Sequence, residues 1–417
     1  MMKTGFWIAG RYSFARKRFR VINIISGISL GGIIVGVSTL LVVMSVLNGF
    51  QQLSRDLFLT IESPVQLVPV RGRSMAVTDS LLRQVGKVEG VSSAQPFAEG
   101  QAVFSTRNKS ELVMVKGLTG EAQERLVHEK RRAIPYVTAG SVAVGESLAW
   151  RLGLTPDEEV RMFSPELISV GLQSLSQPEL LPALSLTDAR VGSLFSLQKI
   201  FDDRYVLTSD AMAKSVLLLG QDQYSGIDIR GSRGFSDSDL ERNLVRWLSS
   251  NRLGGSMRVR TLEEKYQDLF VVMQLEKWAS FSVLMLVIVV AVLSLTGSLA
   301  MTVIDKRREL FYLRCLGLER PQFMTIFIVE GGLTGLVGTA IGSALAWCIC
   351  RAQETWGFVQ LPSKSAFIID AYPVSMHAGD FLVVAFTTIA LCLLVSLYPA
   401  GQAAAIATSH SLDSKSE

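Results

Sequence analysis

The fold is decided by the stretch Val21–Ser54, VINIISGISLGGIIVGVSTLLVVMSVLNGFQQLS, which contains no charged side chain. A helix needs ~20 apolar residues to cross the ~30 Å hydrocarbon layer of a bilayer. The stretch is too long for the ~7–15-residue apolar region of a cleavable signal peptide, and no A-x-A-like cleavage site follows it. It therefore predicts a retained membrane-spanning helix that projects beyond one face of the bilayer.

Three further apolar runs follow in the second half of the chain. Trp278–Ile304 and Phe381–Leu412 are uncharged, and Gln322–Cys350 carries a single charge, Glu330. The 417-residue chain is 49% hydrophobic, which is too apolar for an ordinary soluble enzyme. These runs predict an α-helical membrane protein with four transmembrane helices and a large α+β domain inserted between the first and second.

This pattern divides the chain into nine segments. We expect a cytoplasmic interfacial helix at 1–20, a first span at 21–54, a periplasmic α+β domain at 55–277, a second span at 278–304, a coupling helix at 305–321, a third span at 322–351, a periplasmic loop at 352–379, a fourth span at 380–402 and a tail at 403–417. Aromatic and basic side chains alternate in the first segment, as in helices that lie at a lipid interface.

The orientation follows from the basic residues. Lysine and arginine are frequent before the first span and in the loop 305–321, whereas the loop 352–379 has few. The positive-inside rule predicts that both termini and the 305–321 loop are cytoplasmic. We therefore expect a multi-pass protein of a bacterial inner membrane. The basic clusters indicate topology and contact with membrane lipids rather than with nucleic acid.

The inserted segment has the mixed, punctuated pattern of an α+β domain. The predicted features are strands at Val65–Val70, Val142–Val144, Val160–Phe163 and Tyr205–Thr208, a hairpin of Ala102–Ser105 with Leu112–Val115, a helix after Thr78, capping boxes at Ser238/Glu241 and Thr261/Glu264, and a protruding loop at 164–190. Helix from Leu262 is expected to continue into the second span. The four cysteines all lie outside this domain, so it is predicted to fold without disulfides.

A short basic segment joins the second and third apolar runs: Asp305-Lys-Arg-Arg-Glu-Leu-Phe-Tyr-Leu-Arg-Cys-Leu-Gly-Leu-Glu-Arg-Pro321. Helical spacing separates two faces, one with Leu310, Leu313 and Leu316 and another with Arg307, Phe311 and Arg314. Gly317 predicts a helix end and Pro321 a new start. The segment is either a lever for a cytoplasmic protein or an interfacial connector with no partner.

This segment resembles the coupling region of the FtsX/MacB-type ABC permeases, and other stretches narrow the resemblance to the Lol lipoprotein-releasing permeases (the LolC/LolE family). Those stretches are Ile28-Ser-Leu-Gly-Gly and Ser45-Val-Leu-Asn-Gly-Phe50 in the first span, Ala94-Gln-Pro-Phe, Val144-Gly-Glu and Phe201-Asp-Asp in the domain, and Leu397-Tyr-Pro-Ala in the fourth span. The similarity covers nearly the whole chain in order and spacing. The loop 164–190 does not match clearly.

The resemblance implies a permease that extracts lipoproteins from the inner membrane, pairs with a second permease subunit and passes its cargo to a periplasmic lipoprotein chaperone. A separate ATPase subunit would bind ATP and magnesium, and this chain would bind no cofactor. The implied ATPase-coupling residues are Asp305, Lys306, Arg307, Arg308, Glu309, Leu310, Leu313, Arg314, Leu316 and Gly317, and those at the substrate entry, between the first and second spans, are Asn48, Gly49 and Phe50. A LolC-like or LolE-like role, a homodimer or heterodimer, a chaperone-binding hook at 164–190 and the identity of the cargo stay open.

Other functions are weighed against this one. A MacB-like exporter usually carries its ATPase in the same polypeptide, and no G-x-x-x-x-G-K-[ST] motif occurs here. An FtsX-like signalling permease would have a much smaller outer domain, and a membrane sensor would recruit a kinase or a transcription factor. No H-E-x-x-H motif occurs, and we expect neither an enzyme nor a metal site. Glu330 is either a functional intramembrane charge or a side chain that reaches the interface.

Overall fold

The computed structural model describes residues 21–107, 109–120, 137–138, 140–167, 187–197, 199–360 and 371–409. The chain divides into two compact units. One is the inserted domain, residues 54–270, and the other, the helical unit, combines residues 1–53 with residues 271–417. The predicted interfacial helix at 1–20, most of the predicted loop at 164–190, and residues 361–370 and 410–417 lie outside the described residues.

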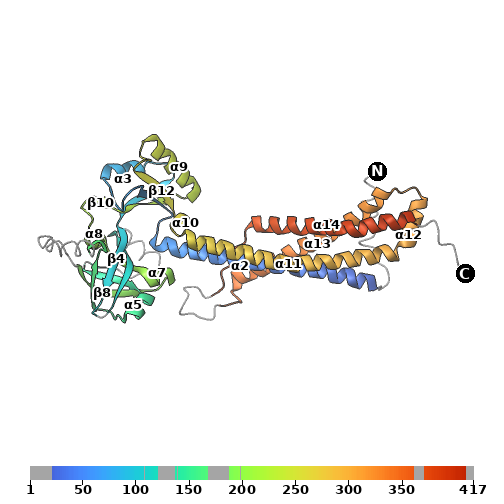
Figure 1. Ribbon diagram of the computed structural model, residues 1–417, viewed down its shortest axis with the longest axis horizontal. Coiled ribbons are helices and arrows are strands. Elements are labelled where there is room, and N and C mark those ends of the chain that lie inside the picture. Colours follow the sequence, from blue (N-terminus) through green and yellow to red (C-terminus); the bar gives the residue numbers. More distant parts are fainter. Residues whose placement is uncertain are drawn as a thin grey trace. The chain divides into compact units, whose positions relative to one another are not determined.

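Most of the helical unit consists of four long helices (Figure 1): α2 (Val21–Ile61), α11 (Gln267–Asp305), α13 (Arg320–Trp356) and α14 (Ala378–Ser409). Each has the length and apolar composition needed to cross a membrane. A short helix, α12 (Arg307–Cys315), lies between α11 and α13. The predicted fold class is confirmed: four candidate membrane spans, with an α+β domain between the first and second.

Glycines set the close contacts between these helices. A Cβ at Gly36 of α2 would lie 3.0 Å from Ile288 of α11, and one at Gly338 of α13 would lie 2.7 Å from Ile33 of α2. A Cβ at Gly335 would meet Cys392 of α14 at 2.8 Å. Side chains larger than hydrogen would push the helices apart, which is why small residues favour close helix packing in membranes. The first and third spans, α2 and α13, therefore approach each other closely.

The inserted domain contains a four-stranded antiparallel sheet with strand order β12-β1-β11-β3. Its strands are β1 (Val65–Pro69), β3 (Val91–Phe97), β11 (Gly226–Gly231) and β12 (Met257–Thr261). The helices α3 (Asp79–Val85) and α9 (Asp237–Ser250) pack against it through a shared apolar core. The short strands β2 (Met75–Ala76) and β10 (Gln223–Tyr224) form a separate pair.

The second part of the domain is a closed barrel with strand order β4-β5-β9-β6-β8-β7. Its strands are β4 (Glu99–Ser105), β5 (Ser110–Leu118), β6 (Ser141–Gly145), β7 (Glu159–Phe163), β8 (Thr187–Phe195) and β9 (Tyr205–Ser209). β4 and β5 form the predicted antiparallel hairpin, with Ala102 opposite Val113. The helices α5 (Glu146–Leu152), α7 (Lys199–Arg204) and α8 (Asp210–Val216) complete this part.

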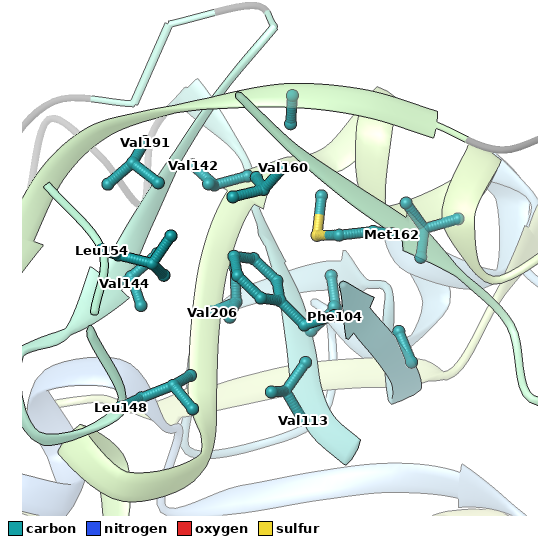
Figure 2. Close-up of a cluster of buried hydrophobic side chains, with 14 of the residues drawn as sticks. Phe104, Val113, Val142, Val144, Leu148, Leu154, Val160, Met162, Val191 and Val206 are labelled. Carbon is teal, nitrogen blue, oxygen red and sulfur yellow. The ribbon is translucent and has the colours of Figure 1, made fainter. Parts of the chain in front are cut away.

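The barrel interior is filled by aliphatic side chains around one phenylalanine. Figure 2 shows Phe104 among Val113, Val142, Val160, Met162 and Val206, all of them buried. Alternate residues of each strand point inward, so every strand contributes to the same core. Apolar side chains therefore fill the barrel, and no charged side chain belongs to this core.

Two local predictions about helix starts need correction. The capping box of α9 is formed by Ser236 and Asp239, not by Ser238 and Glu241. The helix that starts at the Thr261 cap is the short α10 (Leu262–Lys265), and it stops at Tyr266 before α11 begins at Gln267. The helix predicted to run on from Leu262 is therefore interrupted for one residue.

Candidate functional site

The predicted coupling segment folds as a nine-residue helix between two long helices. α11 ends at Asp305 and α12 spans Arg307–Cys315. Gly317 has φ +94°, its N–H donates to Arg314 O at 2.8 Å, and the Leu318 N–H donates to Leu313 O at 3.2 Å. This is a Schellman ending, in which glycine tolerates the left-handed backbone. Pro321 then lies in the first turn of α13.

α12 is anchored by one buried side chain and displays a mixed surface. Leu310 is 1% exposed and packs with Val303, Phe323 and the alanines at the end of α14. Leu313 joins this cluster in part, but Leu316 is 80% exposed because the helix has already ended. The exposed side chains of α12 and of the residue that follows it are Arg307, Arg308, Phe311, Tyr312, Arg314, Cys315 and Leu316. The segment therefore combines a fixed base with an accessible basic and aromatic face.

The remaining predicted coupling residues lie on the flanks of this surface. Asp305 is the last residue of α11 and is exposed, and Lys306 forms an ion pair with Glu309 at 3.3 Å. The structure thus brings all the predicted coupling residues together on one short segment.

The predicted entry residues Asn48, Gly49 and Phe50 lie in α2 but are covered. Asn48 is 3% exposed, and its Nδ2 donates to Asp380 Oδ2 at 2.6 Å. The Phe50 ring meets the edge of Tyr372, with centroids 5.8 Å apart. In this conformation the three residues face the segment that leads into α14.

The seam between α2 and α11 is also closed within one chain. The hydroxyl oxygens of Ser29 and Ser294 are 3.1 Å apart, and a Cβ at Gly32 would lie 3.1 Å from the Ala291 methyl group. Gln51 Nε2 donates to Met273 O at 3.1 Å. A passage between these two helices requires them to separate.

Glu330 and the cysteines show no arrangement typical of catalysis. Glu330 lies in α13 and is partly buried, and its carbonyl accepts a hydrogen bond from Thr334 at 2.9 Å. Among the described residues no group of His, Cys, Asp and Glu could hold a metal ion, and the four cysteines are not paired in disulfides.

Sequence reasoning missed a cluster of buried charges in the inserted domain. Glu62 is fully buried and Lys116 is 2% exposed. Glu62 accepts from Lys116 Nζ and from Lys265 Nζ, each at 2.8 Å, and Lys265 also donates to Glu99 at 2.7 Å. Their positions are far apart in the sequence, so no local motif reveals them. The available signal was the isolated Lys116 within the apolar strand β5.

Burial and charge act against each other in this cluster. Burial alone would raise the pKa of Glu62, but the two ammonium groups of Lys116 and Lys265 outweigh it and hold that pKa well below its usual value. Burial would lower the pKa of Lys116, and the carboxylates of Glu62, Asp228 and Glu99 raise it instead. The pair is therefore charged in the folded domain. The hydroxyl of Tyr266 and the Nε2 of Gln66 also donate to Glu62, at 3.0 and 3.1 Å.

Comparison with known proteins adds the family context. Residues 281–407 match the family model of the FtsX-like permease C-terminal domain. The chain is 27% identical to the lipoprotein-releasing system transmembrane protein LolC of Neisseria meningitidis, over 95% of this chain and 96% of that protein. The resemblance to the Lol permeases is confirmed. Similarity extends to LolE of Haemophilus influenzae, with 24% identity over 99% of this chain and 100% of that protein.

Two solved structures also match in part. The periplasmic region of MacB from Actinobacillus actinomycetemcomitans is 12% identical, with a TM-score of 0.33, and the match covers 51% of this chain and 95% of that one. The extracellular domain of the ABC-type transporter YknZ from Gram-positive bacteria is 11% identical, with a TM-score of 0.31, over 47% of this chain and 99% of that one. The sequence relatives support an ABC permease role for the chain.

Proposed function

We propose that this chain is a permease subunit of an ABC transporter that releases lipoproteins from the bacterial inner membrane. The Lol relatives support the class of cargo, because their names describe a lipoprotein-releasing system and they match the chain along almost all of its length. Removing a multiply acylated protein from a bilayer costs about 0.8 kcal/mol for every buried CH₂ group. The release step therefore needs an external source of energy.

The observation that carries the coupling part of the proposal is the construction of α12. Leu310 ties it to the ends of α11, α13 and α14, so a displacement of α12 is passed to three helices at once. Its exposed face carries arginines and aromatic side chains, which are frequent in protein interfaces. A cytoplasmic ATPase subunit that binds ATP and magnesium is the partner that we propose for this face.

The remaining parts of the proposal rest on the distribution of basic residues and on the Lol relatives. By the positive-inside rule, α12 and both termini are cytoplasmic and the inserted domain is periplasmic. The chain itself is not an enzyme, and it works with a second permease subunit and a periplasmic lipoprotein chaperone. Because the seam between α2 and α11 is closed within one chain, cargo enters when the two helices separate, or between helices of the two subunits.

Leu316 offers a direct test, since it is exposed and contributes nothing to the buried cluster. The tagged protein is purified in mild detergent and its bound proteins are identified by mass spectrometry. We expect an ABC ATPase and a second permease with the wild type, and loss of the ATPase with Leu316→Asp. The matched control is Leu112→Asp, which changes an exposed leucine of the inserted domain. Retention of the ATPase by Leu316→Asp would contradict the proposed docking face, and a kinase or transcription factor in its place would favour a sensor.

A further inference from the structure

Residues 371–380, here called the clasp segment, lie against about two turns of α2, from Ser45 to Gln52. The backbone N–H of Ser375 donates to the carbonyl of Ser45 at 2.9 Å, and the Ser375 hydroxyl donates to Gln52 Oε1 at 2.9 Å. Tyr372 meets Phe50 edge to face. The segment thus makes backbone, side-chain and ring contacts with the same stretch of helix.

Gly49 permits this approach. A Cβ at position 49 would lie 2.3 Å from the carbonyl oxygen of Pro373 and 2.7 Å from the backbone nitrogen of Val374. Backbone atoms cannot be displaced as easily as the end of a flexible side chain, so any larger residue at 49 would lift the clasp segment from α2. The surface of α2 around Gly49 is therefore complementary in shape to the clasp segment.

A polar cluster joins the clasp segment to three helices. Asp380 of α14 accepts from Lys277 Nζ of α11 at 3.1 Å and from Asn48 Nδ2 of α2 at 2.6 Å. The side chains of Lys277 and Asp380 are 19% and 17% exposed. Hydrogen bonds to charged groups away from bulk water are stronger than those at an open surface. Asp380 therefore holds α2, α11 and α14 together at one level of the helical unit.

We propose that the clasp segment is a lateral gate: it covers Asn48-Gly49-Phe50, and a lipid-anchored cargo passes α2 after Asp380 has separated from Lys277 and Asn48. This inference rests on the proposed function, and it adds that the clasp segment controls access to the proposed entry residues. The contacts can break without unfolding a helix, because residues 371–377 are not helical. A cargo or partner that binds the open form better shifts the protein toward it.

A reversible cross-link tests the gate. Gln52→Cys and Ser375→Cys are introduced into a protein whose native cysteines, Cys315, Cys348, Cys350 and Cys392, are replaced, and the pair is bridged with a short bifunctional methanethiosulfonate. The protein is reconstituted in vesicles with its ATPase and partner permease. We expect bridging to lower lipoprotein release at least tenfold and a reductant to restore it. The matched control bridges Arg351→Cys to Thr355→Cys, two exposed positions one helical turn apart on α13 and outside the clasp segment, and should leave release unchanged.

The outcomes separate the two proposals. Normal release by the bridged protein, or failure of the pair to bridge, would overturn the gate while leaving the transporter assignment intact. Absence of release by the reduced protein would overturn the proposed function and the gate with it.

A second variant tests whether Asp380 couples cargo binding to ATP hydrolysis, which a purely structural contact would not affect. We expect Asp380→Asn to raise the cargo-independent fraction of ATP hydrolysis severalfold, and the exchange Lys277→Asp with Asp380→Lys to return it toward the wild-type value. Glu354→Gln, which removes an exposed ion pair with Arg351 on α13, is the control. An unchanged fraction in Asp380→Asn would count against the gate.

Discussion

Replacement of Lys116 by methionine should destabilise the inserted domain far more than loss of a surface cation. The change keeps an unbranched side chain of similar length but removes the ammonium group that lies 2.8 Å from the fully buried Glu62. Removing one partner of a buried ion pair costs about 3–5 kcal/mol, because the other charge stays buried without compensation. Lys265 still contacts Glu62 at 2.8 Å, so we take the lower end, about 3 kcal/mol.

For a domain of this size, each kcal/mol lowers the melting temperature by roughly 2–4 °C, which gives a drop of about 6–12 °C. The midpoint is measured on the full-length protein in detergent by brief proteolysis at increasing temperature, with cleavage of the inserted domain followed on gels. Arg190→Met on β8, which removes an exposed ion pair with Glu159 of β7, is the control and should shift the midpoint little. Adding Glu62→Gln to Lys116→Met should recover part of the loss. Equal midpoints for Lys116→Met and Arg190→Met would refute the reasoning.

Three further predictions concern single groups. Since the folded pKa of Glu62 lies below its unfolded value of about 4.5, its stabilising effect is complete above that pH and is lost in more acidic solution, so Glu62→Gln should weaken the acid dependence of the melting temperature of the domain. Gly338→Val would place atoms within 2.7 Å of Ile33 and should lower the heat stability of the helical unit by about 1–3 kcal/mol, whereas Gly27→Val meets nothing within 4 Å and should not. Gly317→Ala, at φ +94°, should cost about 1–3 kcal/mol locally and speed hydrogen exchange of the amides that follow it.

The membrane spans could be predicted from the sequence, but their ends could not. A long uncharged run is required by the bilayer, and each of the four predicted spans lies within a helix of the structure. α2 nevertheless continues past Ser54 to Ile61, although Arg55 and Asp56 are charged. Charges end a hydrophobic run without ending a helix, and α2 stops just before Pro64, whose ring disfavours helix in the residue preceding it.

Among the strands, too, some could be predicted from local sequence and others could not. β1 was predicted because its apolar side chains are typical of a buried strand. β3, with the sequence VSSAQPF, was missed because it has serine, glutamine and proline and no alternation. Its pairing with β11 makes it a strand, and that partner lies more than a hundred positions along the chain. Local patterns cannot report such a contact.

Of the candidate sites, the one built from a single short segment could be predicted, and the one built from distant segments could not. The short helix α12 was predictable because Gly317 marks its end and Pro321 marks the start of the next helix within one short segment. The cover over Asn48 was not, because Asp380 comes from the other end of the chain. The cap of α9 is predicted at Ser238, but the structure uses Ser236, next to the turn at Gly234 with φ +101°.

The helical unit combines tight helix packing at glycines, which resists separation, with polar contacts of Asp380, which can break more easily. Gly335 interlocks with Cys392 of α14, and Gly338 interlocks with Ile33 of α2, so sliding along either seam would force atoms into overlap. In lipid such close packing is a main source of helix association. The polar contacts of Asp380 can instead break one at a time and be replaced by water at the membrane surface. A push on α12, which Leu310 links to the ends of α11, α13 and α14, should therefore move the interlocked helices together and place relative motion at the clasp segment.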